Sequence, residues 1–384
     1  CREGVGGQAK ERVVKKKVCF GEKKEIVCSF IFRGMKRDTA LSIAGITRHQ
    51  YYYKPKSGRR GKPPSQETLR INGEDVDRVP NHVVIEQIRT TQADPDTDYG
   101  YHKMTYVLLI LGYLINHKKV YRLMNENDLL KDRLQKPSRS FVKYRRVMPS
   151  SPLEILEMDI KFVWVEEYRR SAYVLTVVDT FTRVVLCWHV GYQIRQAQIK
   201  SIWEYIIVHH LQPYDCLGKK IRIEIRNDND SRFVASSVQE FFRENHLTQV
   251  FTHPYTPQEN GHIESFHAIL SERLGRQIFW SLIELEQCLI LFYEKYNNHR
   301  LHSSTCYLPP MVFWNLWEQG HIKSYPDEKK RKIKFRLLIP YHQLSGNMNL
   351  REVPCAPATT LDGLEQVSVL KEMNGAVSFP QPSV

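Results

Sequence analysis

The chain has 384 residues, 42% of them hydrophobic and 26% charged, a composition that excludes a largely disordered protein. Its length suggests two or three domains. The net charge of +14 indicates an anionic partner, and nucleic acid is the default because phosphate neutralisation dominates such binding. A basic surface that serves only solubility is the alternative.

The eight cysteines contain no Cys-x-x-Cys pair, so they favour a reducing compartment over a zinc knuckle or a disulfide framework. The longest apolar runs, such as residues 106–115, are too short to span a bilayer, and no membrane partner is expected. The chain starts at Cys1 and its first methionine is Met35. We therefore expect a fragment, or the product of a frame without its own start codon.

Residues 1–34 are basic and suggest no function, whereas residues 35–65 have the pattern of a helix-turn-helix followed by a linker. A helix is expected over residues 39–44, then a turn at Gly45, then a second helix that starts with a capping box between Thr47 and Gln50. The candidate DNA-reading residues near its start are Arg48, His49 and Gln50. A generic helical hairpin is the alternative for this piece.

A second helical DNA-binding segment is expected over residues 80–135, with helices near residues 83–89 and 101–111. Asn116 is expected to cap a third helix through residue 125. That helix carries a basic face formed by Lys118, Lys119 and Arg122. The face suits DNA phosphates, and an ordinary solvated face is the alternative.

Beyond a basic boundary at residues 136–152, the hydrophobic period changes from helical to strand-like. Three strands are followed by strands that alternate with helices, which predicts a layered α/β domain over residues 150–316. The expected strands cover residues 153–165, 172–179, 183–190, 221–225 and 249–252, and the expected helices cover residues 194–210, 233–245, 263–279 and 283–297. A basic segment and a poorly ordered tail are expected over residues 317–384.

Three acidic residues are candidates for one metal site. Asp159 lies inside the first strand of this domain, Asp228 follows a strand, and Glu264 lies near the start of a helix. A carboxylate inside a core strand is costly unless it is paired or binds a metal. Three carboxylates that converge at a sheet edge suit Mg²⁺ or Mn²⁺, and two such ions can flank a scissile phosphate.

The order and spacing of these acids resemble a known family. Asp228 and Glu264 are separated by thirty-five residues, with Asn-Asp-Asn-Asp-Ser at 227–231 and Thr-Pro-Gln-Glu-Asn-Gly at 256–261. Together with Tyr-Asn-Asn-His-Arg-Leu-His-Ser at 296–303, this text resembles retroviral integrases and two-frame bacterial insertion-sequence transposases.

The resemblance implies an RNase H-like fold, a mixed five-stranded sheet flanked by helices, preceded by all-α helix-turn-helix units. It implies a transposase in which Asp159, Asp228 and Glu264 bind two divalent ions, cleave transposon ends and transfer the 3′-hydroxyl into target DNA. It further implies a homo-multimer on paired ends, an upstream-frame companion protein and the bacterial cytoplasm, associated with the nucleoid. A catalytically impaired DNA-binding descendant is the second hypothesis, and a Holliday-junction or RNase H nuclease is disfavoured because helix-turn-helix units would have no role.

Further residues are interpreted beside the triad. Asp179 is expected to form a structural turn, and His267 either orients Glu264, contacts a phosphate or is a buried structural histidine. Candidate DNA contacts in the flanking loop are Tyr255, Gln258 and Asn260. Two departures motivate the impaired alternative, because Asp230 replaces a glycine and Ser271 replaces a basic residue, for which Arg273 is a possible substitute.

Overall fold

The computed structural model describes residues 20–53, 64–131, 148–252, 260–327 and 332–345. The chain forms two compact units, Cys1–Ser65 and Gln66–Val384. No helix within the described ranges combines the length and the apolar character that a membrane span needs.

The first unit contains three helices, so the segment to which the sequence suggested no function supplies one of them. These are α1 (Phe20–Phe32), α2 (Arg37–Ala44) and α3 (Arg48–Tyr52). Gly45 ends α2 with a φ of 64°, a left-handed value that glycine adopts without strain. The capping box between Thr47 and Gln50 starts α3. The predicted helix, glycine turn and capped helix are therefore confirmed.

The second unit opens with a small mixed structure rather than with helices alone. Its elements are β1 (Glu67–Asn72), β2 (Asp75–Pro80), α4 (Asn81–Ala93), α5 (Tyr101–Ile110), β3 (Tyr113–Leu114) and α6 (His117–Glu126). The strands form an antiparallel sheet in the order β2-β1-β3. The helices that the sequence predicted here are present. The predicted cap is confirmed, because Asn116 Oδ1 accepts a hydrogen bond from the Lys119 N–H at 2.9 Å. The hairpin was missed, although Asn72-Gly73 is a strong hairpin signal.

The central domain is built on the predicted mixed five-stranded sheet, in the order β6-β5-β4-β7-β8. Strands β4, β5 and β6 pair antiparallel, whereas β7 pairs parallel to both β4 and β8. The strands are β4 (Ile155–Val165), β5 (Arg170–Asp179), β6 (Val185–Gly191), β7 (Glu224–Asn227) and β8 (Thr248–Phe251). This arrangement, with helices on both faces, is the RNase H-like fold that the resemblance implied.

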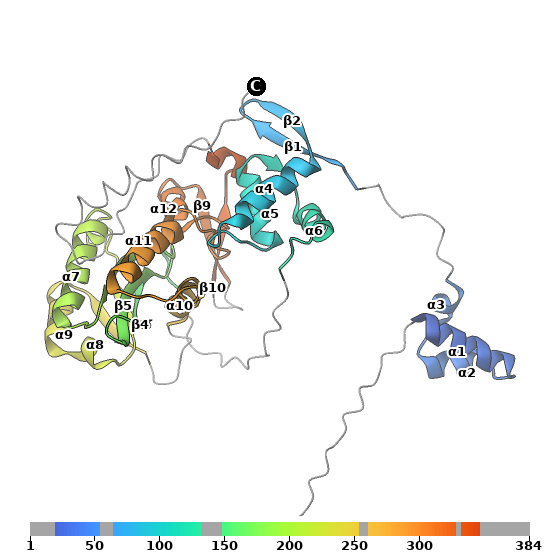
Figure 1. The fold of residues 1–384 in the computed structure, drawn as a ribbon, viewed down its shortest axis with the longest axis horizontal. Helices are drawn as coiled ribbons and strands as arrows, with labels where there is room; N and C mark the ends of the chain where they lie inside the picture. The colour runs from blue at the N-terminus through green and yellow to red at the C-terminus, as the bar shows by residue number, and fades with distance from the viewer. Residues whose placement is uncertain (1–19, 54–63, 132–147, 253–259, 328–331, 346–384) are drawn as a thin grey trace, which may run out of the picture. The chain divides into compact units, whose positions relative to one another are not determined.

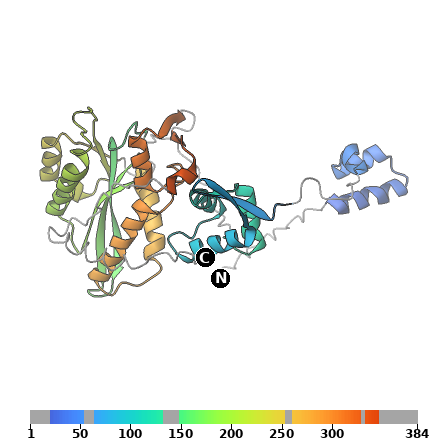
Figure 2. The ribbon, with the colours of Figure 1, turned by 90° about the horizontal axis from the view of Figure 1, so that it is seen from above.

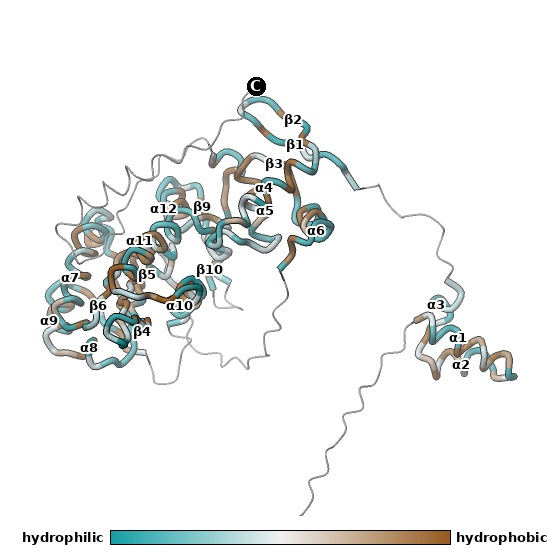
Figure 3. The backbone as a smooth tube through the Cα atoms, in the orientation of Figure 1, coloured by the Kyte–Doolittle hydropathy of each residue, from teal (hydrophilic) through white to brown (hydrophobic). Residues whose placement is uncertain are grey.

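Helices cover both faces of the sheet and bury two apolar clusters (Figures 1 and 2). One face packs on Trp203 of α7 and Phe242 of α9, and the other on Phe266 of α10 and Tyr293 of α11. The helices are α7 (Gln196–Ile206, continued by a π-turn at Ile207–Leu211), α8 (Ser231–Val234), α9 (Ser236–Glu244), α10 (Gly261–Leu274) and α11 (Leu282–Asn298). Figure 3 shows hydrophobic stretches where β5, β6 and α11 meet. Such burial is the main stabilising contribution to this domain.

The chain continues beyond the sheet domain into further ordered structure. Helix α12 (Pro310–Glu318) is followed by a hairpin of β9 (Ile322–Asp327) and β10 (Lys332–Leu337) and by a 3₁₀ turn, η3 (Tyr341–Ser345). The expected poorly ordered residues 351–384 lie outside the described residues. The hairpin was missed because charged side chains alternate with apolar ones in β10, and the sequence reads there as a basic run.

Candidate active site

Two of the predicted acids meet at the parallel pair of β4 and β7. The register pairs Glu157 with Arg226, two positions before Asp159 and Asp228 on their chains, and the charge of Asp159 acts on Asp228. Asp159 lies within β4 with its side chain 27% exposed, and Asp228 is exposed directly after β7. The carboxyl end of β7 therefore presents one acid beside the acid of the neighbouring strand.

The electrostatics of Asp228 show that the two carboxylates interact. Desolvation raises the pKa of Asp228, and the negative charges of Asp159 and Asp230 raise it further. The Asp230 N–H donates to Asp228 Oδ1 at 3.2 Å, which lowers the same pKa but does not reverse the shift. Such a pair is destabilised by its own charge and is suited to a cation.

Helix α10 brings an imidazole to this pair. His267 Nδ1 lies 3.3 Å from Asp159 Oδ2, and the His267 side chain is only 12% exposed. The buried Nε2 atom of His267 has no hydrogen-bond partner among the described residues. One role predicted from the sequence for His267 is to orient Glu264. In the structure His267 contacts Asp159, so it is placed to orient Asp159.

Glu264 lies one turn before His267, in the first turn of α10, and is exposed. No group of three carboxylate, imidazole or thiol side chains within the described ranges is placed to hold a metal ion. The structure thus places Asp159 near Asp228 and, in a separate contact, His267 beside Asp159. It does not gather Glu264 with the two aspartates into a complete metal site, and the assignment of Glu264 as a ligand stays a proposal.

A fully buried acid that the sequence reasoning missed connects β4 to α10. Glu157 accepts hydrogen bonds from the backbone N–H groups of His262 at 3.0 Å and Ile263 at 2.7 Å, and lies 2.9 Å from His262 Nδ1. Burial raises the pKa of Glu157 to about 7, although the Ile263 N–H and the charges of Arg183 and Arg226 oppose this shift. The carboxylate caps the N-terminus of α10 from a neighbouring strand. The missed signal was a second acid two residues before Asp159, on the same face of the strand.

Asp179 has the structural role that was predicted. It is fully buried, and it accepts hydrogen bonds from the N–H and hydroxyl of Thr182 at 2.8 and 2.6 Å and from the Leu153 N–H at 3.2 Å. Burial raises the pKa of Asp179 against these bonds. The side chain therefore closes the turn between β5 and β6.

Asp230 is not the backbone anomaly that the sequence suggested. Its φ is −60°, outside the left-handed region, so no glycine is required. Asp230 caps α8 by accepting from the Arg232 N–H at 2.9 Å, and its carboxylate is bonded to the Arg232 guanidinium, which lowers its pKa. Asp230 is thus paired with Arg232, whose positive charge opposes only part of the effect of Asp230 on the pKa of Asp228.

Ser271, which stands where the resemblance implies a basic residue, has its own local contact. The Ser271 hydroxyl donates to the His267 carbonyl oxygen at 2.6 Å, so it is used within α10. Arg273 Nε lies 3.7 Å from Asp96 Oδ1, in the loop after α4. Lys295 of α11 also reaches this loop, 3.0 Å from Asp94. Arg273 thus contributes to a contact between the helical segment and the core, and its contact with DNA stays a prediction.

Comparison with known proteins identifies domain families in this chain. Residues 149–257 match one integrase core domain family and residues 245–310 match a second, while residues 81–137 match an HTH-like domain. The chain carries an integrase core domain. The HTH-like match falls on the second helical segment, not on the three-helix unit at residues 20–53.

The relatives of this integrase core include proteins of insertion elements. The chain is 29% identical over 217 residues to an uncharacterized 39.2 kDa protein of insertion element IS476 from Xanthomonas euvesicatoria, across 56% of this chain and 60% of that protein. It is 24% identical over 229 residues to the putative transposase InsK of insertion element IS150 from Escherichia coli, across 56% of this chain and 77% of that protein. The chain thus spans less than two thirds of the IS476 protein. These matches confirm the resemblance to insertion-sequence transposases.

Solved structures with a similar integrase-type core share little sequence with this chain. The integrase catalytic core of HTLV-2 in complex with magnesium is 17% identical, with a TM-score of 0.31 over 43% of this chain and 97% of that chain. The catalytic domain of the Mos1 mariner transposase is 14% identical, with a TM-score of 0.32 over 37% of this chain and 70% of that chain.

The helical residues predicted to read DNA are placed as follows. Arg48 donates through Nε to Asp38 at 2.8 Å, Gln50 completes the capping box with Thr47, and His49 is exposed at the start of α3. These contacts leave the edge of α3 accessible but hold Arg48 against α2. DNA contact by α3 remains a prediction.

The basic face of α6 precedes the integrase core. Lys118 is exposed, Lys119 Nζ donates to the Glu67 carbonyl at 2.5 Å, and Arg122 lies 3.7 Å from Glu126. Two of the three cations therefore have protein partners, and their role toward DNA stays a prediction.

The loop before α10 is only partly described. Tyr255 and Gln258 lie outside the described residues. Asn260 is buried at the N-cap position of α10, and its Oδ1 atom has no partner among the described residues. Its burial favours a structural role, while the predicted contact with DNA stays open to experiment.

Proposed function

We propose that this chain is a DNA transposase that cleaves transposon ends in a metal-dependent reaction and transfers the freed 3′-hydroxyl into target DNA. The observation that carries the proposal is the juxtaposition of Asp159 and Asp228 within an integrase core domain. The relatives named as insertion-element proteins support the same reading. An HTH-like segment and a net charge of +14 support DNA as the partner.

The carboxylates fit a divalent cation, Mg²⁺ or Mn²⁺. Their oxygens are the hard ligands that these ions prefer, and the raised pKa of Asp228 reflects a charge that a cation relieves. Asp159 and Asp228 would hold the ion, with Glu264 as the third ligand and a second ion shared among them. A bound divalent ion polarises the phosphate and activates the attacking oxygen. His267 holds the Asp159 carboxylate in place through its 3.3 Å contact.

The partners of the proposed transposase are transposon ends and target DNA in the bacterial cytoplasm. A homo-multimer assembled on paired ends, and a companion protein from an upstream frame, follow from the resemblance to two-frame transposases. The turn at Asp230 does not favour the catalytically impaired alternative, because a φ of −60° requires no glycine there.

The proposal is tested with the variants Asp159→Asn and Asp228→Ala in a Mg²⁺-dependent assay of strand cleavage on the element's own ends. We expect each variant to lose at least about a hundredfold in cleavage rate while DNA affinity changes little. Asp77→Asn, in exposed strand β2, is the matched control and should cleave like the wild type. Wild-type cleavage by Asp228→Ala, or no Mg²⁺-dependent cleavage by the wild type, would overturn the assignment.

A further inference from the structure

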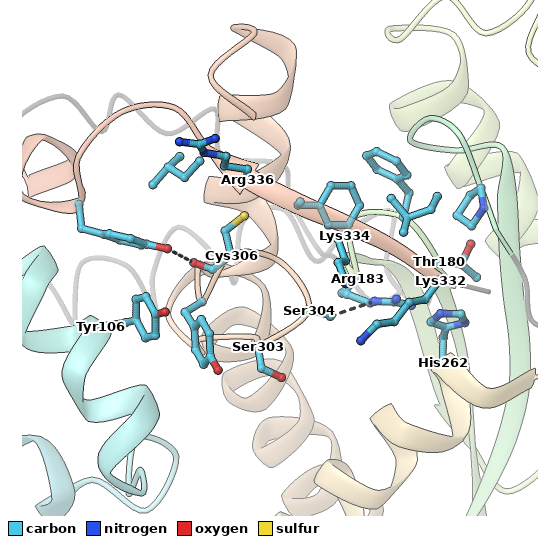
Figure 4. A pocket seen from close by; sticks show the side chains of 17 residues that line it. Tyr106, Thr180, Arg183, His262, Ser303, Ser304, Cys306, Lys332, Lys334 and Arg336 are labelled. Carbon is cyan, nitrogen blue, oxygen red and sulfur yellow. Dashed lines mark hydrogen bonds between the residues drawn. The ribbon is translucent and has the colours of Figure 1, made fainter. Parts of the chain in front are cut away.

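A cavity of about 500 Å³ lies beside the core, where α5, the β5–β6 turn, the loop after α11 and strand β10 meet (Figure 4). This size is typical of sites for small ligands and is far too narrow for a duplex. We call the end at Arg183 and Lys332 the cationic end and the end with the tyrosines the aromatic end, where Arg336 adds a further cation. Figure 4 shows Arg183, Ser304 and Lys332 at the first end and Tyr106 with Cys306 at the second.

The cationic end is organised around Arg183. Its Nε donates to Ser304 Oγ at 3.4 Å, while its buried Nη1 atom has no hydrogen-bond partner among the described residues. Two carboxylates, Glu157 and Asp179, interact with Arg183 through their charge, but both accept bonds from backbone N–H groups. A guanidinium keeps its proton in proteins, so the Nη1 atom of Arg183 can donate a hydrogen bond to a bound anion. Lys332, exposed on β10, adds a second cation to this end.

The aromatic end contains three tyrosines. The rings of Tyr106 and Tyr307 stack with centroids 3.9 Å apart, and the Tyr341 ring meets Tyr106 edge to face at 5.1 Å. The Tyr341 hydroxyl donates to the Cys306 carbonyl at 2.6 Å, which fixes this ring. All three tyrosines are partly exposed. Partly exposed, fixed aromatic rings are the surfaces on which nucleic-acid bases pack without regard to sequence.

The cavity adjoins the candidate active site through His262. This residue lines the cavity, is bonded to Glu157, and precedes Glu264 by two positions on α10. The start of α10 and Arg183 therefore border the same cavity.

We propose that this cavity binds one unpaired nucleotide of the DNA strand processed at the active site. Arg183 and Lys332 hold its phosphate, and the tyrosines at 106, 307 and 341 receive its base. This inference rests on the proposed function, since it names the part of the DNA substrate that the chain holds next to the reacting phosphate.

The test compares the affinity of the full chain for a duplex with a short oligothymidine overhang and for the same duplex with blunt ends, in Ca²⁺ without cleavage. We expect Arg183→Gln and Lys332→Gln each to lower affinity for the overhang duplex by about tenfold, with little change for the blunt duplex. The slope of log affinity against log salt for the overhang duplex should fall by about 0.7 in each variant. Tyr307→Leu should weaken overhang binding without changing this slope.

Lys323→Gln is the matched control, because Lys323 lies on β9 opposite Arg336 and outside the cavity, and its loss removes the same charge from the same hairpin. Since the Nη1 atom of Arg183 is buried, exposed Lys332 keeps the test valid if Arg183→Gln fails to fold. Equal losses on blunt and overhang DNA, or an equal loss in Lys323→Gln, would overturn the proposal. Cleavage by the wild type is scored separately, so failure of the transposase assignment is distinguishable from failure of the nucleotide site.

Discussion

The carboxylate of Glu157, in β4, accepts a hydrogen bond of 2.7 Å from the backbone N–H of Ile263, in the first turn of α10. The same carboxylate accepts from the His262 N–H at 3.0 Å. One buried side chain thus fixes the start of the helix that carries Glu264 and His267 against the strand that carries Asp159. The geometry of the candidate active site depends on this link.

We expect Glu157→Ala to lower the free energy of unfolding by about 3 kcal/mol, because it leaves buried N–H donors and His262 without their acceptor. Cleavage at saturating DNA should fall more than DNA affinity, since α10 loses its anchor beside Asp159. Glu157→Gln should be milder in both measurements because its amide oxygen still accepts a bond. Urea unfolding and a metal-dependent cleavage assay measure the two effects.

Glu154→Ala is the control for this prediction. Glu154 accepts from the N–H and hydroxyl of Ser150 at the start of the same strand, and its loss should cost about 1 kcal/mol or less. Equal effects of Glu154→Ala and Glu157→Ala on cleavage would contradict the anchoring role.

Asp230→Gly, which introduces the glycine that the resemblance leads us to expect at this turn, should not increase cleavage. The φ of Asp230 is −60°, and its charge is compensated by Arg232, so neither backbone strain nor an unpaired charge is relieved. Asp230→Ala should reduce stability by about 1 kcal/mol through loss of the cap on α8. Cleavage rates and thermal unfolding of both variants provide the check, and a severalfold faster Asp230→Gly enzyme would contradict it.

The sequence was sufficient to predict the sheet domain and the strand positions of Asp159 and Asp228, because both depend on local patterns, while their role as metal ligands stays a prediction. Alternating apolar residues define β4 and β5, and the polar turn after β7 places Asp228 at a strand end. The start of β7 was predicted at residue 221 but lies at Glu224, since pairing with β4 and β8 defines the strand.

Contacts between distant segments could not be predicted in this way. The bond from Glu157 to Ile263 joins residues that are 106 positions apart, and nothing near Glu157 in the sequence marks its partner. Arg232 compensates Asp230 through a side-chain conformation that spacing alone does not specify. The cavity at Arg183 needs residues as far apart in the sequence as Tyr106 and Tyr341 to come together.

His210 predicts a loss of stability in mild acid. Burial lowers its pKa to about 4 from an ordinary value of 6.5, although the bond from its ring to the Leu186 carbonyl opposes the shift. Above pH 6.5 the histidine is neutral in both states and contributes nothing. As the pH falls from 6.5 toward 4, the unfolded chain gains a proton that the folded chain does not, which destabilises the fold by about 3 kcal/mol.

Urea unfolding across this pH window should give a flatter profile for His210→Gln than for the wild type. His209→Gln is the control, because that neighbouring imidazole is exposed, and its profile should follow the wild type. Identical pH profiles for His210→Gln and the wild type would show that His210 takes up its proton in the folded state.

Asp96 should limit the contribution of Arg273 to DNA binding. The two side chains lie 3.7 Å apart, with Asp96 only 12% exposed, so the carboxylate competes with phosphate for this guanidinium. We expect Asp96→Asn to raise DNA affinity and to steepen the salt dependence of that affinity by about one phosphate contact. The higher affinity should be lost in the double variant with Arg273→Gln. Asp94→Asn, which removes a carboxylate bonded to Lys295, is the control and should give a smaller gain. If neither Arg273→Gln nor the double variant with Asp96→Asn changes DNA affinity, Arg273 does not bind DNA. Its role would then be limited to the contact between the helical segment and the core.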